Sequence, residues 1–159
     1  MNKSPNGSCH FCKDIENLIH LFVSCKLVDS VWREVFQRIN TFYVKNEIQT
    51  ISKSDNTIIL GISHRDVEIN AIVNTILTTT KWIIWKERNV AQYQKKNITK
   101  LKIINLIKSE ISFISSLAES KNGKDIFTEM TNIFCIYLFQ YEIIYLCHGI
   151  VNDQIHTPF

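Results

Sequence analysis

Glycine and proline are scarce in this 159-residue chain, which contains 4 glycines and 2 prolines. Folds with many tight turns, such as β-sandwiches and barrels, usually need more of both residues. No glycine-rich phosphate loop is present either, which argues against an open α/β nucleotide-binding fold. Apolar residues make up 45% of the sequence and charged residues 21%, so the composition is that of a folded protein. We expect one mainly α-helical domain with long helices and short connections.

Residues 1–8 are polar and lack the apolar segment of a secretory signal. We therefore expect an intracellular protein of the nucleus or cytoplasm, in which the five cysteines are metal ligands or core residues rather than disulfides. The expected organisation is a flexible lead over residues 1–8, then a metal-binding segment with a first helix over 9–42. Residues 43–120 form the helical part of the same domain, and 121–159 form a C-terminal tail.

Three segments show apolar residues at spacings of three and four, the pattern of amphipathic helices. The first covers about residues 27–42, the second about 67–94, and the third about 99–120, with Asp66 as the expected N-cap of the second. The short apolar run at residues 58–62 predicts a strand or a buried extended stretch, because periodicity cannot decide at that length. The inward-facing residues expected in the third helix are Leu101, Ile104, Ile107, Ile111, Ile114 and Leu117 or Ala118.

Four residues near the N-terminus have the spacing of a metal site. Cys9, Cys12, His20 and Cys25 follow the order Cys-x2-Cys-x7-His-x4-Cys. Three thiolates and one imidazole favour Zn²⁺, and four protein ligands leave no open position for substrate, so we expect one structural zinc ion. His10 is a rival ligand, but coordination by a direct neighbour of Cys9 would crowd the turn. The alternative is a metal-free segment with buried thiols, since free cysteine often packs as a small hydrophobic residue.

The same segment resembles a known family. The zinc-binding domain at the C-terminus of non-LTR (LINE-type) retrotransposon reverse transcriptases shows a similar order of residues, carried here by Cys9-His10-Phe11-Cys12, Glu16-Asn17-Leu18-Ile19-His20-Leu21-Phe22, Cys25 and Trp32. Later parts of that domain resemble Ile59-Leu60-Gly61, Lys81 to Arg88 (KWIIWKER) and Lys102 to Glu110, so the similarity covers about residues 9–118. Asn17 departs from the threonine that is usual in the family.

The resemblance implies a zinc-binding, nucleic-acid-binding accessory domain, and a non-catalytic fragment or remnant of such a protein. The chain contains no Tyr-x-Asp-Asp motif and no endonuclease domain, and its aspartates are isolated. Polymerisation requires metal-binding carboxylates close together. We therefore expect no enzymatic activity and no small-molecule substrate.

Positive charge is concentrated in one window of the chain. The net charge is +3, but residues 81–108 contain eight Lys or Arg residues and one acid, Glu87. This asymmetry favours a polyanionic partner, RNA or single-stranded DNA, although a solvated helical face within a structural or protein-interaction module is the alternative. The expected nucleic-acid-binding residues are Lys81, Lys86, Arg88, Lys95, Lys96, Lys100 and Lys102.

Within that set we expect Lys95, Lys96, Lys100 and Lys102 to form the main phosphate-contacting patch, because no acid lies near them in the sequence. Trp82 and Trp85 lie three residues apart on an apolar helix. That spacing favours packing in the core over stacking on bases.

The tail has a different composition. Residues 133–151 are mostly apolar and nearly long enough to cross a bilayer. Gln140, Glu142 and His148 interrupt the run, so we favour a buried or poorly specified helix over a membrane span. Cys135 and Cys147 lie in this run and are expected to be core residues or unpaired thiols.

Overall fold

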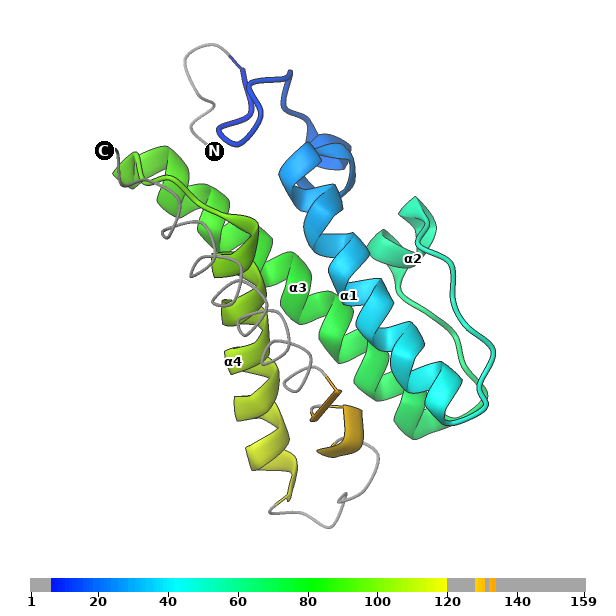
Figure 1. The fold of residues 1–159 in the computed structure, drawn as a ribbon. Coiled ribbons are helices and arrows are strands. Elements are labelled where there is room, and N and C mark those ends of the chain that lie inside the picture. The colour runs from blue at the N-terminus through cyan, green and yellow to red at the C-terminus, as the bar shows by residue number, and fades with distance from the viewer. Residues whose placement is uncertain (1–6, 120–127, 131, 134–159) are drawn as a thin grey trace, which may run out of the picture.

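The computed structural model describes residues 7–119, 128–130 and 132–133, and it is mainly α-helical (Figure 1). Its elements in chain order are the π-helix η1 (His20–Ser24), α1 (Lys26–Lys45), α2 (Asp55–Leu60), α3 (Val67–Gln94) and α4 (Lys100–Glu119). Helices α1, α3 and α4 are the three amphipathic helices that the periodicity predicts. The expected fold class, a short Cys/His segment followed by a small helical bundle, is confirmed.

Helices α1, α3 and α4 share one hydrophobic core. The loop after α3 is short, and α4 returns beside it, while α1 packs against α4 (Figure 1). Isoleucine and aromatic side chains fill the core. The largest fully buried side chains are Trp32, Tyr43, Phe42, Ile39, Ile58, Ile76, Leu77, Ile84, Ile103, Ile107 and Ile111.

Helix α3 begins and ends where the sequence predicts. The Asp66 side chain accepts hydrogen bonds from the backbone N–H groups of Glu68 and Ile69, which satisfies two of the otherwise unpaired donors of the first turn. The predicted register of α4 is correct at its centre, where Ile104, Ile107 and Ile111 are buried. It is wrong at the start, because Leu101 is exposed, and of the two alternatives at the end Leu117 is exposed. Ile103, which the expected inward face omits, is fully buried.

Residues 58–62 do not form the predicted strand or extended stretch. Ser54 accepts a hydrogen bond from Thr57 N at 3.1 Å and so caps a short helix, α2, that buries Ile58. A strand needs a neighbouring strand for its backbone groups. The described part of the chain offers none, with a single isolated bridge elsewhere, whereas one helical turn satisfies these groups locally.

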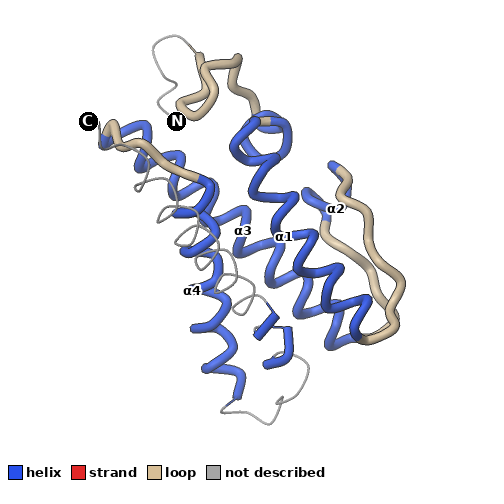
Figure 2. The backbone as a smooth tube through the Cα atoms, viewed as in Figure 1, coloured by secondary structure: helices blue, strands red, loops and turns tan. Residues whose placement is uncertain are grey.

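Two asparagines hold the loops on either side of α2 (Figure 2). Asn40 on α1 donates to Ile51 O and accepts from Ile51 N, both at 2.9 Å. Asn74 on α3 makes the same pair of bonds with Ile62, at 3.0 and 2.9 Å. Each side-chain amide therefore bonds one loop residue as a strand partner would.

Gly61 makes the close approach of Asn74 possible. Its φ of 89° lies in a region that other residues rarely adopt, and a Cβ there would lie 2.3 Å from Asn74 Oδ1. The structure thus explains why a glycine follows Leu60: the backbone turns at the end of α2, and a side chain at position 61 would collide with Asn74 of α3.

The described part of the tail packs on the bundle. Met130 and Ile133 are buried in the main core, and Glu129 forms an ion pair with Lys45 at the end of α1. Residues 1–6 of the expected flexible lead lie outside the described residues, as do Cys135, Cys147 and nearly all of the apolar run. Among the helices described, none combines the length and apolar character that crossing a membrane requires.

We predict that Gly61→Ala lowers the free energy of unfolding by about 2–4 kcal/mol, because it combines backbone strain with displacement of Asn74. Gly7→Ala is the matched control, since Gly7 also has a positive φ but a Cβ there would meet nothing within 4 Å. It should cost about 1 kcal/mol. Urea unfolding measures both values. Equal losses would contradict the role given to Asn74.

Candidate metal centre and basic surface

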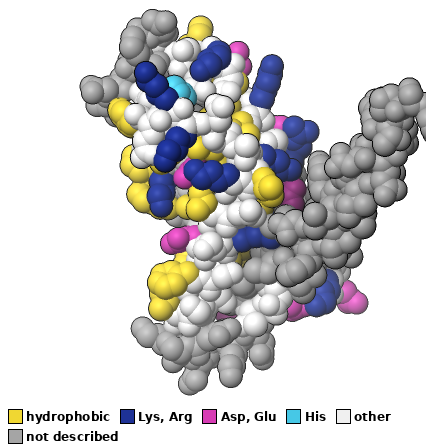
Figure 3. All heavy atoms as spheres, turned by 60° about the vertical axis from the view of Figure 1, so that its left-hand side comes forward, with side chains coloured by type: hydrophobic (Ala, Val, Ile, Leu, Met, Phe, Trp, Pro, Cys, Tyr) yellow, Lys and Arg dark blue, Asp and Glu magenta, His cyan; other side chains and the backbone are white. Residues whose placement is uncertain are grey.

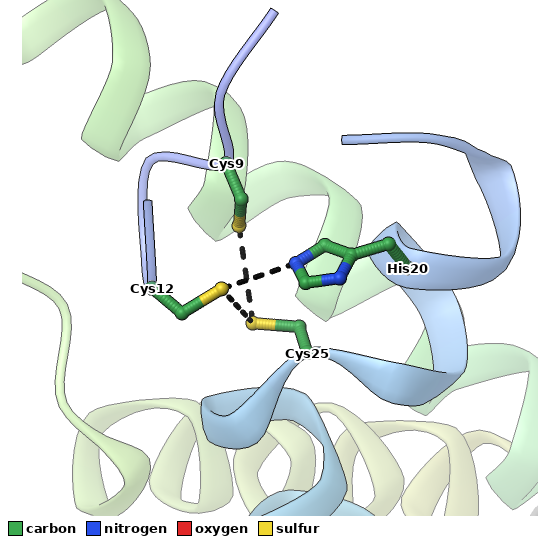
Figure 4. A group of neighbouring side chains, drawn as sticks. All are labelled: Cys9, Cys12, His20 and Cys25. Carbon is green, nitrogen blue, oxygen red and sulfur yellow. Dashed lines mark hydrogen bonds between the residues drawn. The ribbon is translucent and has the colours of Figure 1, made fainter. Parts of the chain in front are cut away.

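A tight hairpin positions the first two candidate ligands. Cys9 N donates to Asp14 O at 2.7 Å, Lys13 N donates to Cys9 O at 2.9 Å, and an isolated bridge pairs Ser8 with Ile15. Lys13 has a φ of 69°, which turns the chain directly after Cys12. Both sulfur atoms consequently point to the same centre (Figure 4).

The π-helix η1 positions the other two ligands. The carbonyl of His20 accepts from Cys25 N at 3.0 Å, so a single wide turn spans the two residues and directs both side chains to the centre (Figure 4). Asn17 Oδ1 accepts from His20 N at 2.7 Å. Asn17 thereby caps the helical residues that lead into η1, and threonine, the usual residue in the resembled motif, is also a common cap. Residues 18 and 19 are helical and continue directly into η1.

Helix α1 anchors this turn to the core. Cys25 is the N-cap of α1, and its carbonyl accepts from Asp29 N at 2.7 Å. Trp32, fully buried on α1, donates its indole N–H to Phe22 O at 2.7 Å. The carbonyl inside η1 and the buried ring therefore fix the metal segment against the bundle.

The four predicted ligands come together. Cys9, Cys12, His20 and Cys25 offer ligand atoms that all lie within 4.8 Å of one another. The Sγ atoms of Cys9 and Cys25 are 3.9 Å apart, those of Cys12 and Cys25 are 3.7 Å apart, and Cys12 Sγ lies 3.1 Å from His20 Nε2. Metal–sulfur bonds of about 2.3 Å in a tetrahedron require sulfurs about 3.8 Å apart. This group can hold a metal ion, and the rival His10 is not part of it.

Two thiols of the cluster have raised pKa values. Burial is the main cause that raises the pKa of the Cys12 thiol to about 12, and the neighbouring Cys25 and Cys9 add to it. Burial also raises the pKa of Cys25. Thiols in this setting retain their protons unless positive charge is supplied. A divalent ion supplies that charge and deprotonates the thiols that it binds.

A basic hollow lies beside the hairpin. Lys13 from the hairpin and Lys95 and Lys96 from the end of α3 line a cavity of about 110 Å³, together with His10, Phe11, Ala91, Asn97 and Ile98. None of these described lining residues is acidic, and none of the three lysines forms an ion pair within the described chain. Figure 3 shows Lys and Arg side chains gathered over the upper part of this face, with a histidine among them.

Other cations of the predicted set are engaged inside the protein. Arg88 forms a two-bond ion pair with Glu16 of the metal segment. Lys100 pairs with Glu34 of α1 at 3.0 Å, and Lys102 pairs with the buried Glu87 at 2.6 Å. The expectation that no acid neutralises Lys100 and Lys102 is wrong, because folding brings Glu34 of α1 to Lys100 and Glu87 of α3 to Lys102.

The remaining members of the set differ in exposure. Lys81 donates to Ile59 O at 3.1 Å and so connects α3 with α2. Lys86, Lys95 and Lys96 are exposed. Sequence reasoning missed Lys13 and His10 as members of the basic surface. Their position next to the Cys-x2-Cys turn is the signal that could have identified them.

The predicted core packing of Trp82 and Trp85 is wrong. Trp82 is 53% exposed, and the two rings stack with centroids 5.0 Å apart and an interplanar angle of 26°. Trp85 is half-buried. The inward face of α3 consists instead of aliphatic side chains such as Ile76, Ile83 and Ile84, which are buried.

Comparison with models of known protein families gives no match, and neither do comparisons with curated proteins and with solved structures. The similarity to the reverse transcriptase zinc-binding domain therefore stays a prediction carried by the residues quoted above.

We predict that the protein binds one divalent metal ion and that His20→Ala abolishes stoichiometric binding, because it removes one of four ligands. His10→Ala is the matched control and should retain the ion. Elemental analysis of the purified variants measures the metal content. Full retention in His20→Ala, or loss in both variants, would contradict the assignment.

We also predict an acid-dependent loss of stability through Glu34. Burial alone would raise the pKa of this carboxyl group, but hydrogen bonds from Lys100 and Arg38, and their charges, lower it overall from 4.5. A carboxylate with a lowered pKa stabilises the fold above its unfolded-state pKa and loses that contribution as the pH falls. In Glu34→Gln the free energy of unfolding should therefore decline less between pH 7 and acid pH.

The control for this experiment is Glu47→Gln, because Glu47 is exposed and forms no ion pair in the described part of the chain. Any loss of metal at acid pH affects the three proteins alike, so the difference between their unfolding curves isolates Glu34. Identical pH profiles for the wild type and Glu34→Gln would refute the prediction.

Proposed function

We propose that this protein is a zinc-stabilised, nucleic-acid-binding accessory domain without catalytic activity. The convergence of Lys13, Lys95 and Lys96 on one hollow supports the proposal. These cations come from two segments about 80 residues apart in the sequence, and the metal cluster holds one of the segments in place. Phosphate oxygens bind where several unpaired cations meet around a concave surface.

Zinc is the ion that best fits the ligand set. Three thiolates with one imidazole favour Zn²⁺ over harder cations, and sulfur separations of 3.7 and 3.9 Å agree with tetrahedral zinc. All four positions are filled by side chains, so the ion has no site for water or substrate. Its role is to hold the hairpin and to present Lys13 and His10 beside the α3–α4 loop.

The reverse transcriptase resemblance is part of this proposal. Two of its sequence elements contact each other, because Glu16 of the metal segment pairs with Arg88 at the end of KWIIWKER, 72 residues later. A bidentate arginine–carboxylate pair fixes relative orientation as well as distance. This contact supports the view that the two elements belong to one functional unit.

A second candidate is a structural or protein-interaction module that does not bind nucleic acid. The ion pairs of Arg88, Lys100 and Lys102 favour it, because they show that part of the basic window stabilises the fold. Lys13, Lys95 and Lys96 distinguish the two candidates, since none of them forms an ion pair within the described structure.

We predict that the protein binds a single-stranded oligonucleotide and that Lys95→Gln combined with Lys96→Gln weakens binding. Each lost phosphate contact reduces the slope of log K against log salt concentration by about 0.7, so the double variant should flatten it by up to about 1.4. Fluorescence anisotropy at several salt concentrations measures the slope. Metal content and helicity should stay unchanged.

The matched control is Lys45→Gln combined with Lys53→Gln, which removes the same charge outside the hollow. Both of these lysines already pair with acids, Glu129 and Asp29. An equal effect of both double variants would indicate a dependence on net charge alone. Failure of the wild type to bind even at low salt would reject the nucleic-acid proposal and favour the structural module.

A further inference from the structure

The outward face of α3 carries an aromatic strip, which we define as Trp82, Lys86, Asn89 and Tyr93 with Trp85 stacked against Trp82. Positions i, i+4, i+7 and i+11 share one face of an α-helix. Trp82 and Tyr93 are 53% and 63% exposed, Lys86 is exposed and Asn89 is half-buried. Large apolar rings thus face solvent along about 16 Å of helix.

The strip is free of exposed negative charge. Glu87 is the one acid in the sequence between residues 69 and 94. It lies on the other side of the helix, 3% exposed and paired with Lys102. A polyanion lying along the strip would therefore meet Lys86 and no carboxylate from α3.

The strip ends near the C-terminal end of α3, where residues that line the basic hollow also lie. Tyr93 precedes Lys95 by two residues, and Lys95 ends α3 in a left-handed conformation with a φ of 51°. The hollow offers cations for phosphates, and the strip on the same helix offers rings with one lysine between them. Alternating rings and cations match a chain in which bases and phosphates alternate.

We propose that the aromatic strip stacks unpaired bases, so that the nucleic acid bound at the hollow is single-stranded. This inference rests on the proposed function and specifies its ligand. Bases in a duplex are stacked on each other and present only their edges, whereas bases of a single strand can stack on Trp82 and Tyr93. Trp82 gains rigidity from its contact with Trp85, which keeps the ring in place.

The test measures binding of an oligothymidine and of a duplex of equal length to the metal-loaded full chain, for the wild type and Trp82→Ala. Loss of one base–aromatic stack should weaken oligothymidine binding about fivefold to a hundredfold at every salt concentration. The salt slope should stay unchanged, because no phosphate contact is lost. Trp82→Phe should restore most of the affinity. Phe113→Ala is the matched control, since Phe113 is 58% exposed on α4, outside the strip.

The outcomes separate this inference from the proposed function. Oligothymidine binding that depends on Lys95 and Lys96 but not on Trp82 would overturn the inference and leave the proposed function standing. Equal losses in Trp82→Ala and Phe113→Ala, or tighter binding of the duplex, would also overturn it. Tryptophan fluorescence gives an independent measure: binding should quench the wild type more strongly than Trp82→Ala, because this variant lacks the most exposed of the three tryptophans and keeps the half-buried Trp85 and the fully buried Trp32.

Discussion

The cluster of Cys9, Cys12, His20 and Cys25 holds a segment that has little other means of folding. Between residues 13 and 19, the large apolar side chains Ile15, Leu18 and Ile19 are exposed, so this stretch buries little hydrophobic surface. Metal coordination can supply folding free energy in such a case. The position of Lys13 and His10, and the approach of Glu16 to Arg88, both depend on this segment being ordered.

The bundle and the metal segment constrain each other. Trp32 lies on α1, and its indole N–H donates to Phe22 O of η1. Cys25 is the N-cap of α1, and its backbone N–H donates to His20 O of η1. Arg88 ties the same segment to α3. Three separate contacts therefore connect the metal segment, which lines one side of the basic hollow, with α1 and α3.

Local patterns predicted a large part of this structure. The apolar periodicity gave α1, α3 and α4, Asp66 gave the start of α3, and the Cys/His spacing gave the four clustered ligands. What local patterns could not supply was long-range pairing. Glu34 and Lys100 are 66 residues apart, so their ion pair becomes visible only after folding. The helical state of residues 55–60 depended on one cap, Ser54, in a run too short for periodicity. Trp82 is exposed because isoleucines form the face of α3 that packs into the core, and the spacing of the two tryptophans does not show which face that is.

The amide pairs made by Asn40 and Asn74 have a consequence for how this chain behaves among copies of itself. An extended, isoleucine-rich segment with free N–H and C=O groups is a template on which another molecule can add a strand, and from there a fibril can grow. In the two loops flanking α2, the backbone groups of Ile51 and Ile62 are already bonded to the side chains of Asn40 on α1 and Asn74 on α3. The sequence contains 26 isoleucines. Each asparagine therefore occupies backbone groups that could otherwise pair with a strand of another copy of the chain.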